Sequence, residues 1–210
     1  MIQNPSETLS FCRVLPVLTV NDPERAIRLC VALQRGGMRG VEITLRTPEA
    51  FQAIRAVKRT LPELTLAAGT VMNADAMMEA RDAGADFAVS PGFTASLADC
   101  ADAQNYPWLP GVATASETMA ALERGLGCFK LFPAAALNGL DLLRSFAGPL
   151  ARARFCPTGG LTLANFRKYL ALPNVVCVGG SWMVPNDRIA DEDWSAIERL
   201  CRETMNPTPE

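Results

Sequence analysis

Short runs of apolar, β-favouring residues recur along the chain, and each is followed by a stretch with helical patterning. The predicted strands are Val14–Val20, Gly40–Leu45, Leu64–Ala68, Phe87–Val89, Pro107–Leu109, Cys128–Phe132, Arg154–Cys156 and Val175–Val178. From the second run onward they recur every 20–25 residues or so, roughly the length of one strand, one helix and two short loops. The spacing predicts eight βα units.

Residues typical of helix ends lie between these strands. The predicted amino-terminal caps are Asp22, Thr47, Asn73, Thr94 and Ser116, and the predicted helix stops are Gly84 and Gly125. Two of the caps precede a proline at the first helical position, where the missing N–H is no loss. An opening helix over Ser6–Phe11 and a closing helix over Asp191–Thr204 flank the set.

Eight βα units in about 200 residues predict a (β/α)₈ TIM barrel with an extra N-terminal helix. We expect one domain over residues 1–210, with the barrel elements over about 12–182 and the closing helix over 191–204. The competing layout is an open doubly wound sheet. Such a sheet usually has fewer strands and would not place chemistry at the ends of so many of them, so we favour the barrel.

The composition excludes several classes of binding partner. The formal net charge is −2 and the basic residues are scattered, so we expect neither nucleic acid nor a membrane as a partner. The start of the chain lacks the pattern of a signal peptide, and no apolar run approaches the roughly 18–20 residues of a membrane span. The seven cysteines include no CxxC pair, which favours structural roles in a reducing cytoplasm.

The chain contains no histidine. The usual general base is therefore missing, as is the commonest ligand of a catalytic transition metal. We expect no metal and no cofactor, although a site built from Asp and Glu stays open. Acid–base chemistry must come from carboxylates, Lys, Tyr, Cys or water.

The second predicted strand carries polar residues at every other position. Glu42, Thr44 and Arg46 alternate with apolar residues, so they point into the barrel or its mouth. A polar face on a strand would be unremarkable at a solvent-exposed sheet, but a barrel strand is covered on its outer side. This pattern therefore favours a functional role over a merely amphipathic strand.

The sixth predicted strand contains Lys130 within an apolar run. A lysine there must be paired, snorkelling or catalytic, and its bulky neighbours disfavour snorkelling. At the ordinary lysine pKa, only about four in ten thousand side chains are neutral at pH 7. Burial and a nearby cation both disfavour the ammonium, and Arg46 is a candidate for that cation. Lys130 is thus a candidate nucleophilic amine.

Two glycine pairs follow the last two predicted strands. They are Gly159-Gly160, preceded by Thr158, and Gly179-Gly180, followed by Ser181. Glycine lets backbone N–H groups approach an anion, and the loops after strands seven and eight form the usual phosphate site of such barrels. Together the pairs predict a phosphoester site. Thr70, at the end of the third strand, would join the same rim.

These segments, taken in order, resemble one family. They are Glu42-Ile43-Thr44-Leu45-Arg46-Thr47, Ala68-Gly69-Thr70, Ser90-Pro91-Gly92, Pro110-Gly111-Val112, Phe129-Lys130-Leu131-Phe132-Pro133-Ala134, Arg154–Gly160 and Gly179-Gly180-Ser181-Trp182. The series resembles the bacterial KHG/KDPG aldolases, which cleave 2-keto-3-deoxy-6-phosphogluconate, and the likeness runs from about Cys12 to Trp194. The sequence of the loop Ala134–Asn138 differs from the one commonly found in the family, and we assign this loop no role.

The resemblance implies a class I aldolase that forms pyruvate and glyceraldehyde 3-phosphate. It implies that Lys130 is the Schiff-base lysine, that Glu42 is the general acid/base, and that Arg46 and Thr70 hold the pyruvate carboxylate. Thr158 would lie near the substrate hydroxyl, and the glycine pairs with Ser181 would surround the phosphate. The family also implies a homotrimer whose N-terminal helix covers the barrel bottom, and it raises cleavage of 4-hydroxy-2-oxoglutarate as a further activity.

Three alternatives remain at this point. A 2-keto-3-deoxy-6-phosphogalactonate aldolase differs in the configuration at C4, and Thr158 favours the gluconate substrate without deciding between them. A phosphosugar epimerase or isomerase would use the same glycine loops but would not require Lys130 beside Glu42. A non-catalytic ligand-binding barrel would have no reason to keep Lys130, Glu42 and both glycine pairs.

Overall fold

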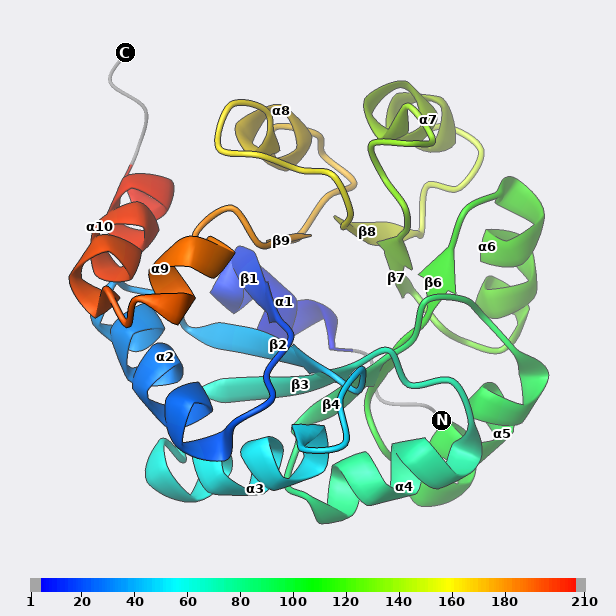
Figure 1. The fold of residues 1–210 in the computed structure, drawn as a ribbon. Helices are drawn as coiled ribbons and strands as arrows, with labels where there is room; N and C mark the ends of the chain where they lie inside the picture. Colours follow the sequence, from blue (N-terminus) through cyan, green and yellow to red (C-terminus); the bar gives the residue numbers. More distant parts are fainter. Residues whose placement is uncertain (1–4, 207–210) are drawn as a thin grey trace.

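The computed structural model describes residues 5–206, so both ends of the expected domain 1–210 lie outside the described residues (Figure 1). Its strands are β1 (Val14–Leu18), β2 (Gly40–Thr44), β3 (Thr65–Gly69), β4 (Phe87–Val89), β5 (Trp108–Leu109), β6 (Gly111–Val112), β7 (Cys128–Leu131), β8 (Arg154–Pro157) and β9 (Val178–Gly180). Its helices are α1 (Ser6–Cys12), α2 (Pro23–Arg35), α3 (Ala50–Thr60), α4 (Ala74–Asp82), α5 (Ala95–Gln104), α6 (Ala115–Glu123), α7 (Gly139–Phe146), α8 (Phe166–Leu170), α9 (Asn186–Ala190) and α10 (Trp194–Met205).

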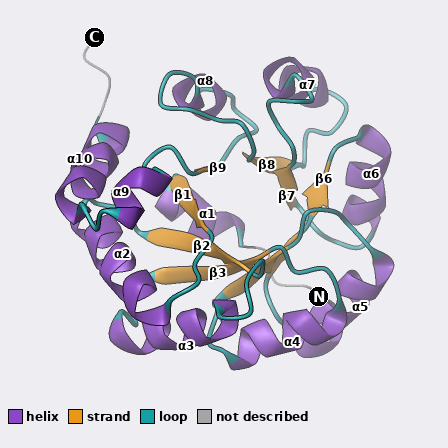
Figure 2. Cartoon of the chain, in the orientation of Figure 1, coloured by secondary structure: helices purple, strands orange, loops and turns teal. Residues whose placement is uncertain are grey.

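The strands form one closed parallel barrel. One sheet has the order β5-β4-β3-β2-β1-β9 and a second has the order β6-β7-β8. Isolated parallel bridges, Phe155 to Val175 and Thr158 to Gly179, join β8 to the β9 segment. The helices form a ring around the strands (Figures 1 and 2). The prediction of a (β/α)₈ barrel is confirmed.

The fifth barrel strand differs from the prediction, because it is divided into β5 and β6. Pro110 lies between the two pieces and has no N–H to continue the ladder with β4. Its carbonyl accepts a hydrogen bond from the backbone N–H of Lys130 at 2.8 Å, and Gly111 then pairs with Lys130 in β7. The fifth barrel strand therefore extends beyond the predicted Pro107–Leu109 to Val112.

Helix caps are predicted well at three positions and wrongly at two. The side chains of Asp22, Asn73 and Thr94 each accept a backbone N–H of the following helix. Thr47 does not cap α3; its hydroxyl donates to the carbonyl of Val20. Ser116 lies inside α6, which Thr114 and Glu117 begin with a reciprocal capping box.

The carboxyl-terminal elements also differ from the predicted boundaries. The last barrel strand is β9, so Gly179 and Gly180 lie within the strand rather than in the loop after it. The expected closing helix is α10, which begins at Trp194, and the short helix α9 precedes it. The predicted start at Asp191 is three residues early, because the polar turn over 191–193 resembles an exposed helix face.

Two apolar layers hold the barrel together. The larger layer packs the outer faces of the strands against the helices and contains Val41, Ile43, Phe129 and Leu131. The smaller layer fills the barrel interior with Leu9, Leu15, Ala67, Phe87, Val89, Leu109, Cys128, Cys156 and Cys177. Leu9 comes from α1, which lies inside the ring of outer helices (Figure 1). The opening helix therefore contributes to the core that closes one end of the barrel.

Candidate active site

Glu42 and Lys130 meet inside the barrel. Lys130 Nζ lies 3.0 Å from Glu42 Oε1 and 3.4 Å from Oε2, although the two residues are 88 positions apart in the chain. Relative exposures are 1% for Glu42 and 6% for Lys130. Removing two charges from water is costly unless each compensates the other, so a buried isolated pair of this kind is an indication of function.

The strand pattern explains how both side chains reach the interior. Val41 and Ile43 on β2, and Phe129 and Leu131 on β7, pack into the outer layer. Side chains alternate along a strand, so the residue between each of these pairs points inward. The inward orientation predicted for Glu42 and Lys130 is confirmed by their contact.

The immediate surroundings of the Lys130 amine are a carboxylate and an aromatic ring. Its Nζ lies 5.4 Å from the centroid of the Phe132 ring, which follows β7. Arg46, expected as a neighbouring cation, instead donates from Nε to Thr70 Oγ1 at 3.3 Å. Phe132 is not among the predicted site residues, because an aromatic residue at a strand end is ordinarily a core residue.

Gly69 is a site residue that sequence reasoning missed. A Cβ atom at this position would lie 2.2 Å from Glu42 Oε1, far inside van der Waals contact. Because Gly69 has no side chain, the β3 backbone can lie next to the Glu42 carboxylate without a steric clash. The sequence feature that could have indicated this role is the Ala68-Gly69-Thr70 segment, in which only Thr70 is among the predicted site residues.

Arg46 and Thr70 stand beside each other on the barrel rim. Thr70 directly follows β3 and has φ of 61°, a region that side chains with a Cβ seldom occupy. Arg46 also lines a cleft of about 320 Å³ that it shares with Ser181. One cation and two hydroxyls thus lie on neighbouring parts of the mouth, with Arg46 and Ser181 exposed and Thr70 half-buried.

The two glycine pairs lie next to each other. Thr158 and Gly179 form a parallel bridge, and a Cβ on Gly179 would lie 2.4 Å from Thr158 Oγ1. Gly159 and Gly160 have φ of 98° and 76°, so L side chains at either position would strain the backbone. The structure therefore brings together the segments that the sequence predicted as a phosphoester site, with Gly179 and Gly180 contributing from β9.

The arrangement is suited to amine catalysis. A buried primary amine, a carboxylate able to take its proton, and a polar rim all lie at the carboxyl ends of the strands, where barrel enzymes place their chemistry. Within residues 5–206, no three His, Cys, Asp or Glu side chains are arranged to hold a metal ion. No helix in this part of the chain has the length and apolar character of a membrane span. The fold and the site define a barrel equipped for Schiff-base chemistry.

Comparison with known proteins gives the family. Residues 6–200 match the family model of the KDPG and KHG aldolases. The chain is 46% identical over 192 residues to the KHG/KDPG aldolase of Escherichia coli strain K12, covering 91% of this chain and 90% of that one. It is 47% identical over 190 residues to the 2-dehydro-3-deoxy-phosphogluconate aldolase of Zymomonas mobilis, covering 90% and 89%.

A solved structure agrees with these sequence matches. The KDPG aldolase of Legionella pneumophila, crystallised with pyruvate as a covalent carbinolamine, superposes with a TM-score of 0.94 at 40% identity, covering 97% of this chain and 99% of that one. The chain belongs to the KDPG and KHG aldolase family. It is a class I aldolase, a carbon–carbon lyase.

Proposed function

We propose that the chain cleaves 2-keto-3-deoxy-6-phosphogluconate to pyruvate and glyceraldehyde 3-phosphate, with Lys130 as the Schiff-base lysine. The observation that carries the proposal is the buried contact between Lys130 and Glu42, 3.0 Å apart. The names of the Escherichia coli and Zymomonas mobilis relatives support the substrate.

The first half of the reaction forms the imine. Glu42 accepts a proton from the Lys130 ammonium, and the neutral amine adds to the C2 ketone to give a carbinolamine. The carbinolamine oxygen is protonated and leaves as water, which produces a protonated imine. The positive imine nitrogen then withdraws electrons from the neighbouring carbon–carbon bonds.

The second half breaks the C3–C4 bond. Glu42, through a water molecule, removes the C4 hydroxyl proton, and C4 becomes the aldehyde carbon of glyceraldehyde 3-phosphate. The bonding electrons move into the imine and leave pyruvate as an enamine on Lys130. Protonation at C3 and addition of water then release pyruvate and restore the free amine.

The remaining site residues bind and orient the substrate. Arg46 and Thr70 hold the keto-acid carboxylate, since the guanidinium fork fits a carboxylate. Thr158, between the imine and the glycine loops, contacts the substrate hydroxyl. Gly159, Gly160, Gly179, Gly180 and Ser181 surround the phosphate. The shared cleft of Arg46 and Ser181 supports placing both ends of the substrate at this mouth.

The substrate is tested by a pyruvate-release assay on three compounds. We expect the highest kcat/KM with the gluconate-derived keto acid, a lower value with its C4 epimer from galactonate, and measurable cleavage of 4-hydroxy-2-oxoglutarate. A higher value for the galactonate epimer would reassign the substrate. Conversion of a phosphosugar without release of pyruvate would favour an epimerase or isomerase.

We also propose that the protein is a homotrimer in the cytoplasm. Support comes from the family resemblance and from the seven cysteines, all of which are free thiols. Exposed apolar side chains at Phe11, Met72 and Met119 offer surface that association could cover. Sedimentation equilibrium should give three times the mass of one chain, and a monomer at micromolar concentration would contradict the trimer.

A further inference from the structure

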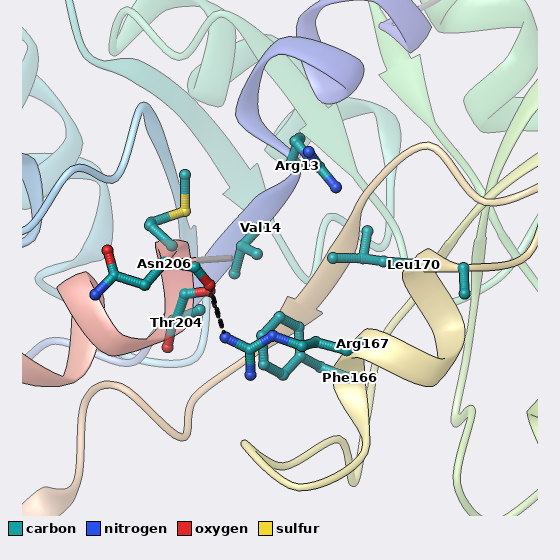
Figure 3. A pocket seen from close by; sticks show the side chains of 9 residues that line it. Arg13, Val14, Phe166, Arg167, Leu170, Thr204 and Asn206 are labelled. Carbon is teal, nitrogen blue, oxygen red and sulfur yellow. Dashed lines mark hydrogen bonds between the residues drawn. The ribbon is translucent and has the colours of Figure 1, made fainter. Parts of the chain in front are cut away.

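A separate hollow lies at the end of the barrel opposite the mouth (Figure 3). It has a volume of about 460 Å³ and is bounded by Val14, the short helix α8 and the carboxyl end of α10. Val14 is the first residue of β1, whereas the Lys130 site lies where the strands end. The hollow is therefore distinct from the candidate active site, and nothing in the aldolase reaction requires it.

Arg13 enters this hollow from the junction of α1 and β1. Its backbone has φ of 59° and ψ of −42°, a conformation that is costly for a residue with a Cβ. Its side chain is exposed and makes no hydrogen bond or ion pair with the residues that the structure describes. A long cationic side chain is thus held at a strained position without a partner among residues 5–206.

Arg167 enters from α8 and is fixed in place. Its Nη2 donates to the carbonyl oxygens of Glu203 and Asn206, each at 3.0 Å, and its guanidinium lies 4.6 Å from the centroid of the Phe166 ring. Figure 3 shows it reaching from α8 towards the end of α10. A guanidinium has five N–H donors. Those on Nε and Nη1 have no acceptor among residues 5–206, so this preorganised cation can still bind an anion.

The lining around the two arginines is suited to an anion with a hydrocarbon part. None of the described residues that line the hollow is acidic, while Leu170, Ala171 and Met205 supply accessible apolar surface. Guanidinium groups match the planar oxygen pairs of carboxylates and the oxygens of phosphates. The volume falls within the range of small-molecule sites.

We propose that this hollow binds a small organic oxyanion, a metabolite bearing phosphate or carboxylate groups. Arg13 and Arg167 pair with its oxygens, and the side chains of Leu170 and Met205 contact its carbon skeleton.

The test measures binding of two probes, inorganic pyrophosphate and succinate, by isothermal titration calorimetry on the full chain. The variant is Arg13→Asn, since asparagine tolerates positive φ and removes the cation. The matched control is Arg199→Gln, which removes an exposed cation from α10 outside the hollow. Binding at the glycine-rich mouth does not involve Arg13, so the component of binding that changes with this variant reports on the hollow.

We expect Arg13→Asn to weaken one binding component about tenfold, the loss that follows removal of a charge-assisted hydrogen bond. Arg199→Gln should bind as the wild type does, and both variants should keep the wild-type kcat/KM for pyruvate release. The probe that binds more tightly identifies the preferred oxyanion. Isotherms of Arg13→Asn that match the wild type for both probes would overturn the proposal. Should Arg13→Asn fail to fold, Arg13→Gly provides the same comparison without backbone strain.

Discussion

The two halves of the barrel interior differ in chemistry although the same strands build them. On β7, Cys128 and Lys130 both point inward. Cys128 packs among apolar side chains near α1, and burial raises the pKa of its thiol, which stays neutral. Lys130, two residues further along, lies 3.0 Å from the Glu42 carboxylate as a buried ion pair.

Both side chains point inward, so orientation alone does not explain the difference. The position of a residue along the strand determines whether a charged side chain is tolerated in the barrel interior. At the closed end, burial likewise raises the pKa of the Cys12 thiol to about 11. The mouth offers a carboxylate, a rim cation and hydroxyls. Substitutions at the mouth should therefore change catalysis, and substitutions at the closed end should change stability.

The largest expected effect is at Lys130. Lys130→Ala removes the nucleophile, and pyruvate release should fall on the order of 10⁴-fold or more. The variant should also lose roughly 3–5 kcal/mol of unfolding free energy, because Glu42 is left buried without its partner. Steady-state assays and chemical denaturation measure the two effects. Lys168→Ala, at an exposed position of α8, is the control and should leave both unchanged.

Glu42→Gln should separate imine formation from bond cleavage. The amide keeps the shape of the side chain but cannot take a proton, so turnover should fall by about 10²–10⁴-fold. Pyruvate should still be captured on Lys130 over long incubation with borohydride. Turnover equal to that of the wild type would remove Glu42 from the general-base role.

Gly69→Ala should disturb the same carboxylate from the neighbouring strand. The added methyl would lie 2.2 Å from Glu42 Oε1, so the carboxylate must move. A displacement of about 1 Å can cost on the order of 10²-fold in rate, and we expect a loss of that size in kcat. Gly148→Ala, where a Cβ would meet nothing within 4 Å, is the matched control. Equal kcat for the two variants would contradict the role given to Gly69.

The smallest effect on catalysis is expected at the closed end. Leu15→Ala opens a cavity in the interior cluster and should lower the free energy of unfolding by about 2–5 kcal/mol. The kcat of the folded variant should stay within about twofold of the wild type, since the cavity lies outside the mouth. Urea denaturation and an assay corrected for the folded fraction make the comparison. A large loss of kcat would show that the two halves are not independent.

Much of this arrangement could be predicted from the sequence. Alternation along β2 and β7 placed Glu42 and Lys130 inward, and the spacing of the strands indicated a barrel. These features are local, because each depends on the period of one strand. The order of the strands follows from the general rule that consecutive strands of a (β/α)₈ barrel pair with one another.

The rest depends on contacts between distant segments. The meeting of Glu42 with Lys130 requires the closed barrel, and the bond of Arg46 to Thr70 requires the register of β2 and β3. The role of Gly69 depends on how closely one backbone approaches a side chain of another strand. The strand break at Pro110 depends on pairing with Lys130 in the next strand, which the sequence does not show. The cap at Thr114 was missed because Ser116, two residues later, is an equally favourable capping residue.

The central claim is that Lys130 forms the Schiff base, and reductive trapping tests it most directly. The wild-type protein is incubated with pyruvate and borohydride, digested, and analysed by peptide mass spectrometry. We predict a pyruvate-derived mass increase on the peptide containing Lys130, and none on those containing Lys58 or Lys168. Absence of the adduct from the Lys130 peptide, or its presence on another lysine, would contradict the account.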